Sequence, residues 1–192
     1  MTAPEEQVVT SFEPDQVVAE WFLSVTVANP WLVDIGEVLA FVLHPWTFRA
    51  AVAVAAVAAW RAGRRHAAVI AGVTLVLGGL LGVLLKLVIQ RARPVWGDPV
   101  AAELGYSMPS GHALNAALGS VLLLGLAWPW LVRRERTRVA VVAAGVVVAI
   151  AMLDRVVLGV HYPTDVLVGA SLGVALALGA ARLTSHVERV PA

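Results

Sequence analysis

The stretch AAVIAGVTLVLGGLLGVLLKLVIQ, residues 67–90, carries a single charged side chain, that of Lys86 near its end. A helix that crosses the hydrocarbon core of a bilayer needs about 20 mostly apolar residues. Backbone polar groups find no water there, so a helix satisfies them internally. This stretch alone predicts a transmembrane helix, and therefore an integral membrane protein.

The rest of the chain has the same character. Of its 192 residues 59% are hydrophobic and 14% are charged, whereas about a quarter of a soluble domain is charged. Residues 112–132, 139–158 and 164–183 predict further spans, and the shorter stretch 46–61 predicts a fifth. Residues 17–44 contain a proline and three acids, and they predict an interfacial helix plus a short or tilted span. We expect an all-α membrane bundle of five to six transmembrane helices.

The length suits one domain. We expect a polar N-terminal segment over residues 1–16, a single membrane domain over 17–183 and a short C-terminal tail over 184–192. No basic residue precedes an apolar core at the N-terminus, so no cleaved signal peptide is predicted. The sequence has no cysteine, which excludes disulfides, thiolate metal sites and a cysteine nucleophile.

Basic residues are distributed unequally between the two faces that a hairpin topology predicts. Nine of the 14 lie on one face, which the positive-inside rule assigns to the cytoplasm. The five on the outer face are Arg49, Lys86, Arg91, Arg93 and Arg155. Several tryptophans fall near the expected helix ends, as in an aromatic belt. A group of outer cations that departs from the rule suggests a function there.

The first unusual outer segment is KLVIQRARP, residues 86–94. Lys86 and Arg93 are seven residues apart, about two helical turns, so they share a helix face. Pro94 then ends the helix. Both side chains are suited to binding an anion together, but they are equally suited to reaching separately into the lipid headgroups.

The second segment is MPSGH, residues 108–112. Ser110 is a good helix N-cap, and the start of a helix offers N–H groups and a positive dipole to an anion. Ser110 and Gly111 are therefore candidates to direct backbone N–H groups at a phosphate, with His112 beside them. The alternative is a capped helix with a histidine at the interface.

The third segment is DRVVLGVHYPTD, residues 154–165. Arg155 closes one helix, His161 follows in the loop, and Asp165 lies in the first turn of the next helix. A carboxylate there can accept the Nδ1 proton of His161 and raise the basicity of the imidazole. The alternative is an aspartate that complements the helix dipole beside an interfacial histidine.

Together the three segments place three cations, two histidines and an aspartate on one membrane face, where charged groups are expensive and usually functional. Their pattern, Lys-x6-Arg-Pro, Pro-Ser-Gly-His and Arg-x5-His-x3-Asp, resembles that of the type 2 phosphatidic acid phosphatase superfamily. That superfamily also includes the vanadium haloperoxidases. The resemblance covers about residues 60–183 and is greatest for its bacterial membrane lipid phosphatases.

The resemblance implies a metal-independent phosphatase with no cofactor. His161 would be the nucleophile that forms a phosphohistidine, Asp165 would orient it, and His112 would be the general acid. The residues that would bind the phosphate are Lys86, Arg93, Ser110, Gly111 and Arg155. Bottom-up reasoning agrees, because phosphoryl transfer depends mainly on positioning and charge stabilisation. No cluster of acids indicates Mg²⁺, since Asp98 and Glu103 stand apart in the loop.

One position differs from the family pattern, which has serine where this chain has Asp154. On a helix Asp154 points about 100° away from Arg155, so we expect it to miss the phosphate. Facing the site, it would repel an anion. Its expected part is to tune substrate choice or to pair with a nearby cation.

The depth of the expected site, at the outer membrane–water interface, suggests a lipid phosphate or diphosphate that enters laterally from the bilayer. Polyprenyl diphosphate, phosphatidic acid and phosphatidylglycerophosphate all fit. The Ala-, Val- and Arg-rich composition suggests a GC-rich bacterium and so favours the first. The expected location is the cell membrane, with the site facing outside. No nucleic-acid partner is expected, and no oligomeric state is predicted.

Three other functions remain open. A lipid phosphotransferase would use the same site with a second lipid as acceptor. A non-enzymatic lipid or anion transporter would spread its charges through the depth of the helices, whereas here they cluster on one face, Asp34 and Glu37 apart. A vanadate-dependent haloperoxidase would share the anion site, but those relatives are soluble and larger.

Overall fold

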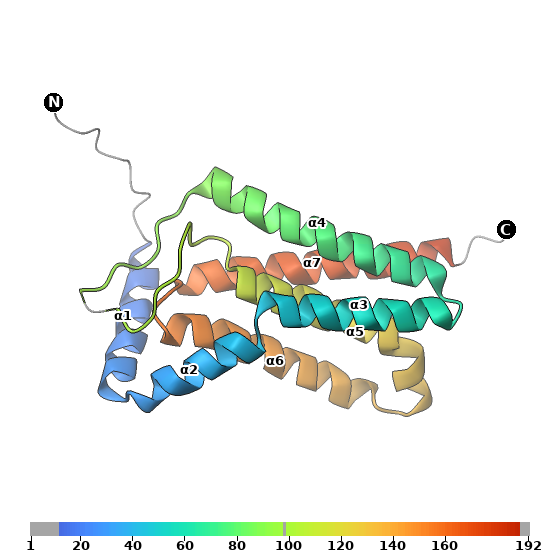
Figure 1. Ribbon diagram of the computed structural model, residues 1–192, viewed down its shortest axis with the longest axis horizontal. Helices are drawn as coiled ribbons and strands as arrows, with labels where there is room; N and C mark the ends of the chain where they lie inside the picture. The colour runs from blue at the N-terminus through green and yellow to red at the C-terminus, as the bar shows by residue number, and fades with distance from the viewer. Residues whose placement is uncertain (1–11, 98, 189–192) are drawn as a thin grey trace.

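The computed structural model describes residues 12–97 and 99–188, and within them the chain is helical with no strand. The helices are α1 (Glu13–Ala28), α2 (Trp31–Val42), α3 (Pro45–Arg61), α4 (Arg65–Ile89), α5 (Gly111–Arg133), α6 (Thr137–Val157) and α7 (Pro163–Val187). Helices α3 to α7 run roughly along one long axis, while α1 lies across one end of the bundle (Figure 1).

Five segments of the described chain are long and apolar enough to cross a membrane. Four are α4, α5, α6 and α7, and the fifth is α2 and α3 together, Trp31–Arg61. The prediction of an all-α integral membrane bundle is confirmed, with five spans. The expected sixth span does not form, because residues 17–44 divide between the crosswise α1 and the short α2 that leads into α3.

Helix α5 lies at the centre of the bundle, where its Leu114, Leu118 and Leu122 join the main core cluster. It packs closely on α7, which carries Gly169 and Gly173 four residues apart. A Cβ atom on Gly169 would lie 2.5 Å from the Ser110 carbonyl oxygen, and one on Gly173 would lie 2.5 Å from that of Leu114. Small residues at this spacing let membrane helices approach closely. This approach brings the start of α5 next to the start of α7.

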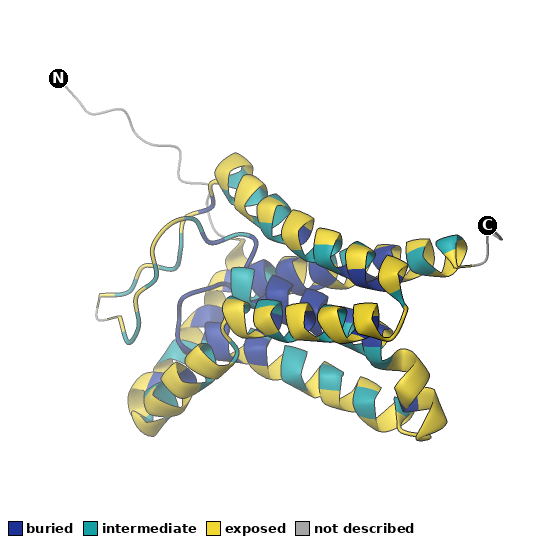
Figure 2. Cartoon of the chain, turned by 45° about the vertical axis from the view of Figure 1, so that its right-hand side comes forward, coloured by how far each residue is buried: buried dark blue, intermediate teal, exposed yellow. Residues whose placement is uncertain are grey.

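The outward faces of the helices are exposed, and the buried residues lie along the centre of the bundle (Figure 2). Many of the exposed side chains are large and apolar. Phe41, Val54 and Val88 are each more than 70% exposed. Such a surface suits hydrocarbon, because lipid chains solvate apolar side chains that water would not. Trp21, Trp46, Trp60, Trp128 and Trp130 are also exposed, as residues of an aromatic belt are.

The ends of the membrane domain differ from the predicted boundaries. Helix α1 begins at Glu13, so the predicted polar segment over residues 1–16 contributes four residues to it, and residues 1–11 lie outside the described part. At the other end α7 continues to Val187, into the predicted tail over 184–192, of which residues 189–192 are outside the described part.

Helix α1 is fixed to the end of the bundle by polar contacts. The Thr26 hydroxyl donates to the carbonyl oxygen of Val157 at the end of α6, at 2.8 Å. Asp15 is buried and accepts a hydrogen bond from the Thr164 backbone N–H of α7, at 2.9 Å. The crosswise helix therefore contacts the same end of the bundle at which the three unusual segments meet.

Candidate active site

The three segments singled out in the sequence converge at one end of the bundle. The end of α4, the start of α5 and the connection from α6 to α7 all lie there, with α1 across them (Figure 1). A loop over residues 90–110 joins α4 to α5 and lies at the same end of the bundle. The structure therefore brings all the predicted site residues into one region, and it adds four residues that were not predicted.

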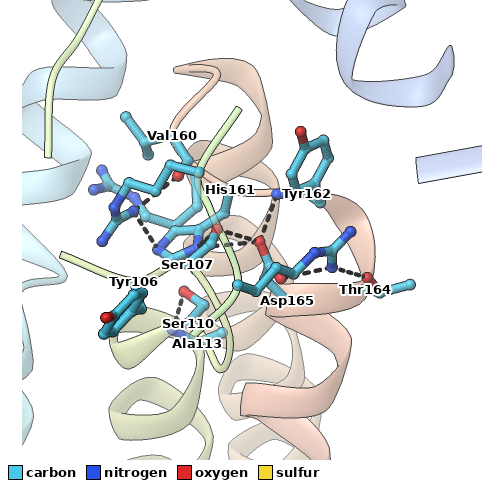
Figure 3. A network of polar contacts seen from close by, with 12 residues as sticks. Tyr106, Ser107, Ser110, Ala113, Val160, His161, Tyr162, Thr164 and Asp165 are labelled. Atoms are coloured by element: carbon cyan, nitrogen blue, oxygen red, sulfur yellow. Dashed lines mark hydrogen bonds and ion pairs between the residues drawn. The ribbon is translucent and has the colours of Figure 1, made fainter. Parts of the chain in front are cut away.

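His161 is almost fully buried and is held by a serine as well as by the expected aspartate. Its Nδ1 lies 3.2 Å from the Ser107 hydroxyl and 3.5 Å from Asp165 Oδ2. The Ser107 hydroxyl in turn donates to Asp165 Oδ2. Figure 3 shows the three side chains together. Since the shorter contact is the one with Ser107, this serine lies as a link between the imidazole and the carboxylate.

The tautomer of His161 follows from its other nitrogen. Nε2 lies 3.1 Å from Nη1 of Arg93, and a guanidinium can only donate. Nε2 therefore accepts and carries a lone pair, which leaves the proton on Nδ1, facing Ser107. Burial lowers the pKa of His161 below its ordinary value; Asp165 opposes this, and the Arg93 cation adds to it. The imidazole is accordingly neutral at neutral pH.

Asp165 is fully buried, and both of its oxygens have partners. Oδ2 accepts from the Tyr162 backbone N–H at 2.9 Å as well as from Ser107, which makes Asp165 part of the cap of α7. Oδ1 accepts from Nη1 of Arg91 at 2.8 Å. The residue thus fulfils both interpretations of the sequence, since it complements the helix start and also lies beside the histidine.

Arg91 connects the site to α1. Its Nη2 donates to Asp15 at 2.7 Å, and its Nη1 donates to Thr164 as well as to Asp165. The guanidinium also stacks on the ring of Tyr162, with its central carbon 4.4 Å from the ring centroid. Arg91 is 5% exposed and bridges two buried carboxylates, so it belongs to the support of Asp165 and not to the phosphate-facing cations.

The three predicted phosphate-binding cations point toward the loop over 90–110. Lys86 Nζ donates to the carbonyl oxygens of Tyr106 and, at 3.4 Å, Ser107. Arg93 donates to the Gly105 carbonyl oxygen at 3.0 Å and to that of Val160 at 2.8 Å. Backbone carbonyls therefore hold both side chains in place, and Arg93 also contacts His161 Nε2 at 3.1 Å.

Arg155 is oriented by its neighbour Asp154. The Asp154 Oδ2 atom accepts from Arg155 Nε at 2.9 Å and from its Nη2. This agrees with the expectation that Asp154 pairs with a nearby cation. The pairing leaves Nη1 of Arg155 to reach across the site, where it donates to Glu103 at 2.8 Å.

Glu103 lies among the candidate phosphate-binding and catalytic residues. Its Oε2 is 3.0 Å from Nη2 of Arg93, and its Oε1 is 2.8 Å from Nη1 of Arg155. The same two oxygens lie 3.8 Å from His161 Nε2 and 3.8 Å from His112 Nδ1, respectively. The expectation that Glu103 stands apart from the site is wrong, because the loop folds back over the cations. Asp98, the other acid of that loop, lies outside the described residues.

The charge on Glu103 is fixed by its neighbours. Burial alone would raise the pKa of its carboxyl group, but the Arg93 and Arg155 cations hold the pKa below its ordinary value. A negatively charged carboxylate is therefore bound between the two arginines, with one histidine ring on each side of it.

The start of α5 is built by Ser110. Its hydroxyl accepts from the Ala113 N–H at 3.5 Å, so it is the predicted N-cap. Its own backbone N–H, however, donates to the Asp165 carbonyl oxygen at 3.0 Å. The expectation that this N–H is directed at a phosphate is therefore wrong. Gly111 remains suited to that part, because a Cβ added there would meet open space.

His112 lies in the first turn of α5 and faces Glu103, with the His44 ring 5.4 Å from its own. One turn further along α5, the Asn115 amide donates to the Gly111 carbonyl oxygen at 2.8 Å. Asn115 also accepts from Nε of Arg49 in α3, at 3.1 Å. These contacts fix the direction in which α5 begins, and with it the position of His112.

Four residues of the site were missed in the sequence, namely Asp15, Arg91, Glu103 and Ser107. Arg91 was noted only as an outer cation, and the other three lie in a polar N-terminal segment or in the loop. The signal that could have found Ser107 is its place three residues before Ser110, in the same short polar stretch. For Asp15 and Glu103 the sequence carries no local signal, since their partners are distant in the chain.

Comparisons with known proteins agree on one family. The model of the PAP2 superfamily matches residues 67–189. Phosphatidylglycerophosphatase B of Bacillus subtilis is 39% identical over 102 residues, which are 50% of this chain and 48% of that protein. Undecaprenyl-diphosphatase of Sulfolobus acidocaldarius is 32% identical over 114 residues, 53% of this chain and 50% of that protein. The chain thus spans about half the length of these curated relatives.

A solved structure is similar over a larger part of the chain. The crystal structure of a transmembrane PAP2-type phosphatidylglycerolphosphate phosphatase from Bacillus subtilis superimposes with a TM-score of 0.80 at 25% identity. The superposition covers 93% of this chain and 88% of that one. The likeness therefore includes the helices before residue 67 as well as the region of the three motifs.

Proposed function

Because the chain belongs to the PAP2 superfamily, as its three motifs predicted, we propose that it is a membrane phosphatase that hydrolyses a lipid phosphate or diphosphate. The observation that carries this proposal is the position of the Glu103 carboxylate. Two arginines bind it, and its oxygens lie 3.8 Å from His161 Nε2 and from His112 Nδ1. A phosphoryl group at the same point would have one histidine on either side.

The proposed reaction has two displacements. His161 Nε2, which bears a lone pair, attacks phosphorus, and the bond from phosphorus to the leaving oxygen breaks as His112 donates a proton to that oxygen. His112 then takes a proton from a water molecule, which attacks the phosphohistidine and releases inorganic phosphate. Ser107 and Asp165 hold the Nδ1 proton of His161, which leaves Nε2 unprotonated, with the lone pair that makes the attack.

Charge stabilisation in this reaction comes from the cations that surround the phosphate position. Arg93 and Arg155 bind its equatorial oxygens, and Lys86 and the Gly111 N–H lie at the same end of the bundle. Ser110 contributes by capping α5 and by tying it to Asp165. Helix starts and guanidinium groups are both well suited to phosphate.

The location of the site and the names of the relatives support the proposed substrate class. The site lies at one end of an apolar bundle, where a lipid headgroup reaches it from the bilayer. Relatives are named for phosphatidylglycerophosphate, undecaprenyl diphosphate and, in Mycolicibacterium smegmatis, decaprenylphosphoryl-5-phosphoribose. All three carry a terminal phosphate on a lipid.

The site is proposed to face the outside of a bacterial cell membrane. The connection between α5 and α6, at the opposite end of the bundle, contains Arg133, Arg134, Arg136 and Arg138. The positive-inside rule assigns that end to the cytoplasm.

The test is release of inorganic phosphate by the purified protein in detergent micelles. The panel contains polyprenyl diphosphate, phosphatidic acid and phosphatidylglycerophosphate, each also offered with a second lipid as acceptor. We expect phosphate release from at least one lipid, and little release by the His112→Ala variant. No release from any lipid would reject the proposal, and phosphate found on the acceptor lipid would make the protein a phosphotransferase.

We also expect full activity in the presence of EDTA. In many phosphoryl-transfer enzymes Mg²⁺ neutralises the charge of the phosphoryl oxygens, and here the Arg93 and Arg155 side chains lie around the proposed phosphate position. The measurement is the turnover of the best substrate of the panel before and after dialysis against EDTA. Loss of turnover that only Mg²⁺ restores would show that the reaction depends on a metal.

A further inference from the structure

We propose that Glu103 is a specificity-determining residue. Its carboxylate occupies the phosphate position between Arg93 and Arg155, and it is displaced by phosphate monoesters and diphosphates but not by the phosphodiester headgroups of bilayer lipids. This inference rests on the proposed function of the site. It assigns to Glu103 a part that neither the three motifs nor the proposed chemistry includes.

The geometry of Glu103 is that of a bound ligand. Its two oxygens bind two different guanidinium groups, Arg93 through Nη2 at 3.0 Å and Arg155 through Nη1 at 2.8 Å. Neither arginine is available to a phosphoryl oxygen in that direction while the carboxylate is in place. The substrate must therefore displace Glu103 before His161 and His112 can reach the phosphorus.

Displacement of Glu103 requires little rearrangement. Its side chain is 27% exposed, whereas the side chain of Arg155 is 3% exposed and that of Arg93 is 13% exposed. The carboxylate is thus the accessible partner of the group, and the cations form the fixed part. Rotation of one side chain toward the interface would open the phosphate position.

The exchange discriminates between ligands by their charge. A carboxylate and a phosphodiester each carry one negative charge, so replacing the first by the second gains no Coulomb energy. A phosphate monoester carries about −1.5 to −2 at neutral pH, because its second pKa is about 6. A diphosphate carries still more charge. Only these ligands gain attraction to Arg93 and Arg155 that repays the loss of Glu103.

Discrimination of this kind matters at the surface of a membrane. Phosphodiester headgroups are the common phosphates of a bilayer, and a site at the membrane interface is exposed to them continually. Without an internal anion, Lys86, Arg93 and Arg155 would attract these headgroups as well. The Glu103 carboxylate keeps the site closed to them and open to the rarer substrates with higher charge.

The first arm of the test measures binding without turnover. Wild-type protein and the Glu103→Gln and Glu37→Gln variants are titrated with inorganic phosphate in detergent, and the shift of the thermal unfolding midpoint gives Kd. Glutamine keeps the size and the hydrogen-bonding oxygen of Glu103 and removes only its charge. We expect Kd to fall about tenfold for Glu103→Gln, the effect of one like charge at contact distance.

Glu37 is the matched control, because it is an exposed acid of α2 with no place in the proposed chemistry. We expect the Kd of the Glu37→Gln variant for inorganic phosphate to equal that of the wild type. An equal Kd for Glu103→Gln and wild type, or the same shift in both variants, would overturn the proposal. If Glu103→Gln does not fold, Glu103→Asp serves instead, since its shorter side chain weakens the contact with the arginines and should lower Kd as well.

The second arm measures selectivity. Turnover of the best substrate is followed in micelles with increasing phosphatidylglycerol, a phosphodiester lipid. We expect no change in KM for the wild type and a competitive rise of about tenfold for Glu103→Gln. Equal inhibition of both proteins would overturn the proposal. Failure of every lipid in the panel would reject the phosphatase function, while the phosphate titration would still decide the part played by Glu103.

Discussion

Replacement of His161 by alanine is expected to lower turnover by at least about 10⁴-fold, the scale on which enzymes lose activity when a nucleophile is removed. The reason is geometric. In this site the imidazole nitrogen that carries the lone pair, Nε2, lies 3.8 Å from the anion position. Its proton is held on the opposite nitrogen by Ser107.

The measurement combines phosphate release with trapping of the intermediate. Wild-type protein is allowed to react with ³²P-labelled substrate and is then denatured at alkaline pH. It should retain the label, since a phosphohistidine survives at alkaline pH. The His161→Ala variant should retain none. His186 provides a matched control, because it is an exposed histidine near the far end of α7, and His186→Ala should keep wild-type turnover and labelling.

Two results would contradict this assignment. Normal turnover of His161→Ala would show that the nucleophile lies elsewhere. Labelling of the variant at the wild-type level would show that the trapped phosphate is on another residue. Because His161 is buried, its removal can also destabilise the fold. The thermal unfolding midpoint of the variant shows whether the protein is folded under the conditions of the assay.

The elements of the site that could be predicted are those set by local sequence. Ser110 caps α5 because its hydroxyl oxygen can accept from an N–H of the first turn that has no other partner, and Pro163 starts α7 because its fixed φ suits a first turn. Hydrophobic runs of bilayer length predicted the spans. These signals place each motif at a helix end, and alternating helix directions then bring the three ends to one face.

The path of the loop over 90–110 could not be predicted in the same way. Its shape is set by carbonyl groups that bind Lys86 and Arg93, and such contacts are visible only when both partners are placed. Glu103 consequently looked like a solvated loop acid. The α2–α3 segment was uncertain for a related reason, since its acids and its proline obscured a span that is interrupted only between Val42 and Pro45.

Arg91 shows how a residue outside the motifs can support them. Its guanidinium is the cation nearest to two buried carboxylates, Asp15 at 2.7 Å and Asp165 at 2.8 Å. Removal of the charge by Arg91→Leu would leave both acids buried without a positive partner. Breaking a buried ion pair from one side costs about 3–5 kcal/mol of folding free energy. We therefore expect a large fall in the thermal unfolding midpoint, followed by tryptophan fluorescence in detergent.

We also expect Arg91→Leu to lower kcat, because it removes the cation that binds Asp165 beside His161. Comparison with Asp15→Asn separates this catalytic loss from the loss of stability. That variant keeps Arg91 paired with Asp165, so we expect a smaller loss of stability and near-normal kcat. Arg91→Lys keeps a positive charge but cannot bind two carboxylates through separate nitrogens of one guanidinium. Its stability should therefore lie between that of Arg91→Leu and that of Asp15→Asn. Equal stability of Arg91→Leu and wild type would mean that the bridge contributes nothing. If Asp15→Asn lowered kcat as much as Arg91→Leu, the contact with α1, and not the charge beside Asp165, would be what positions His161.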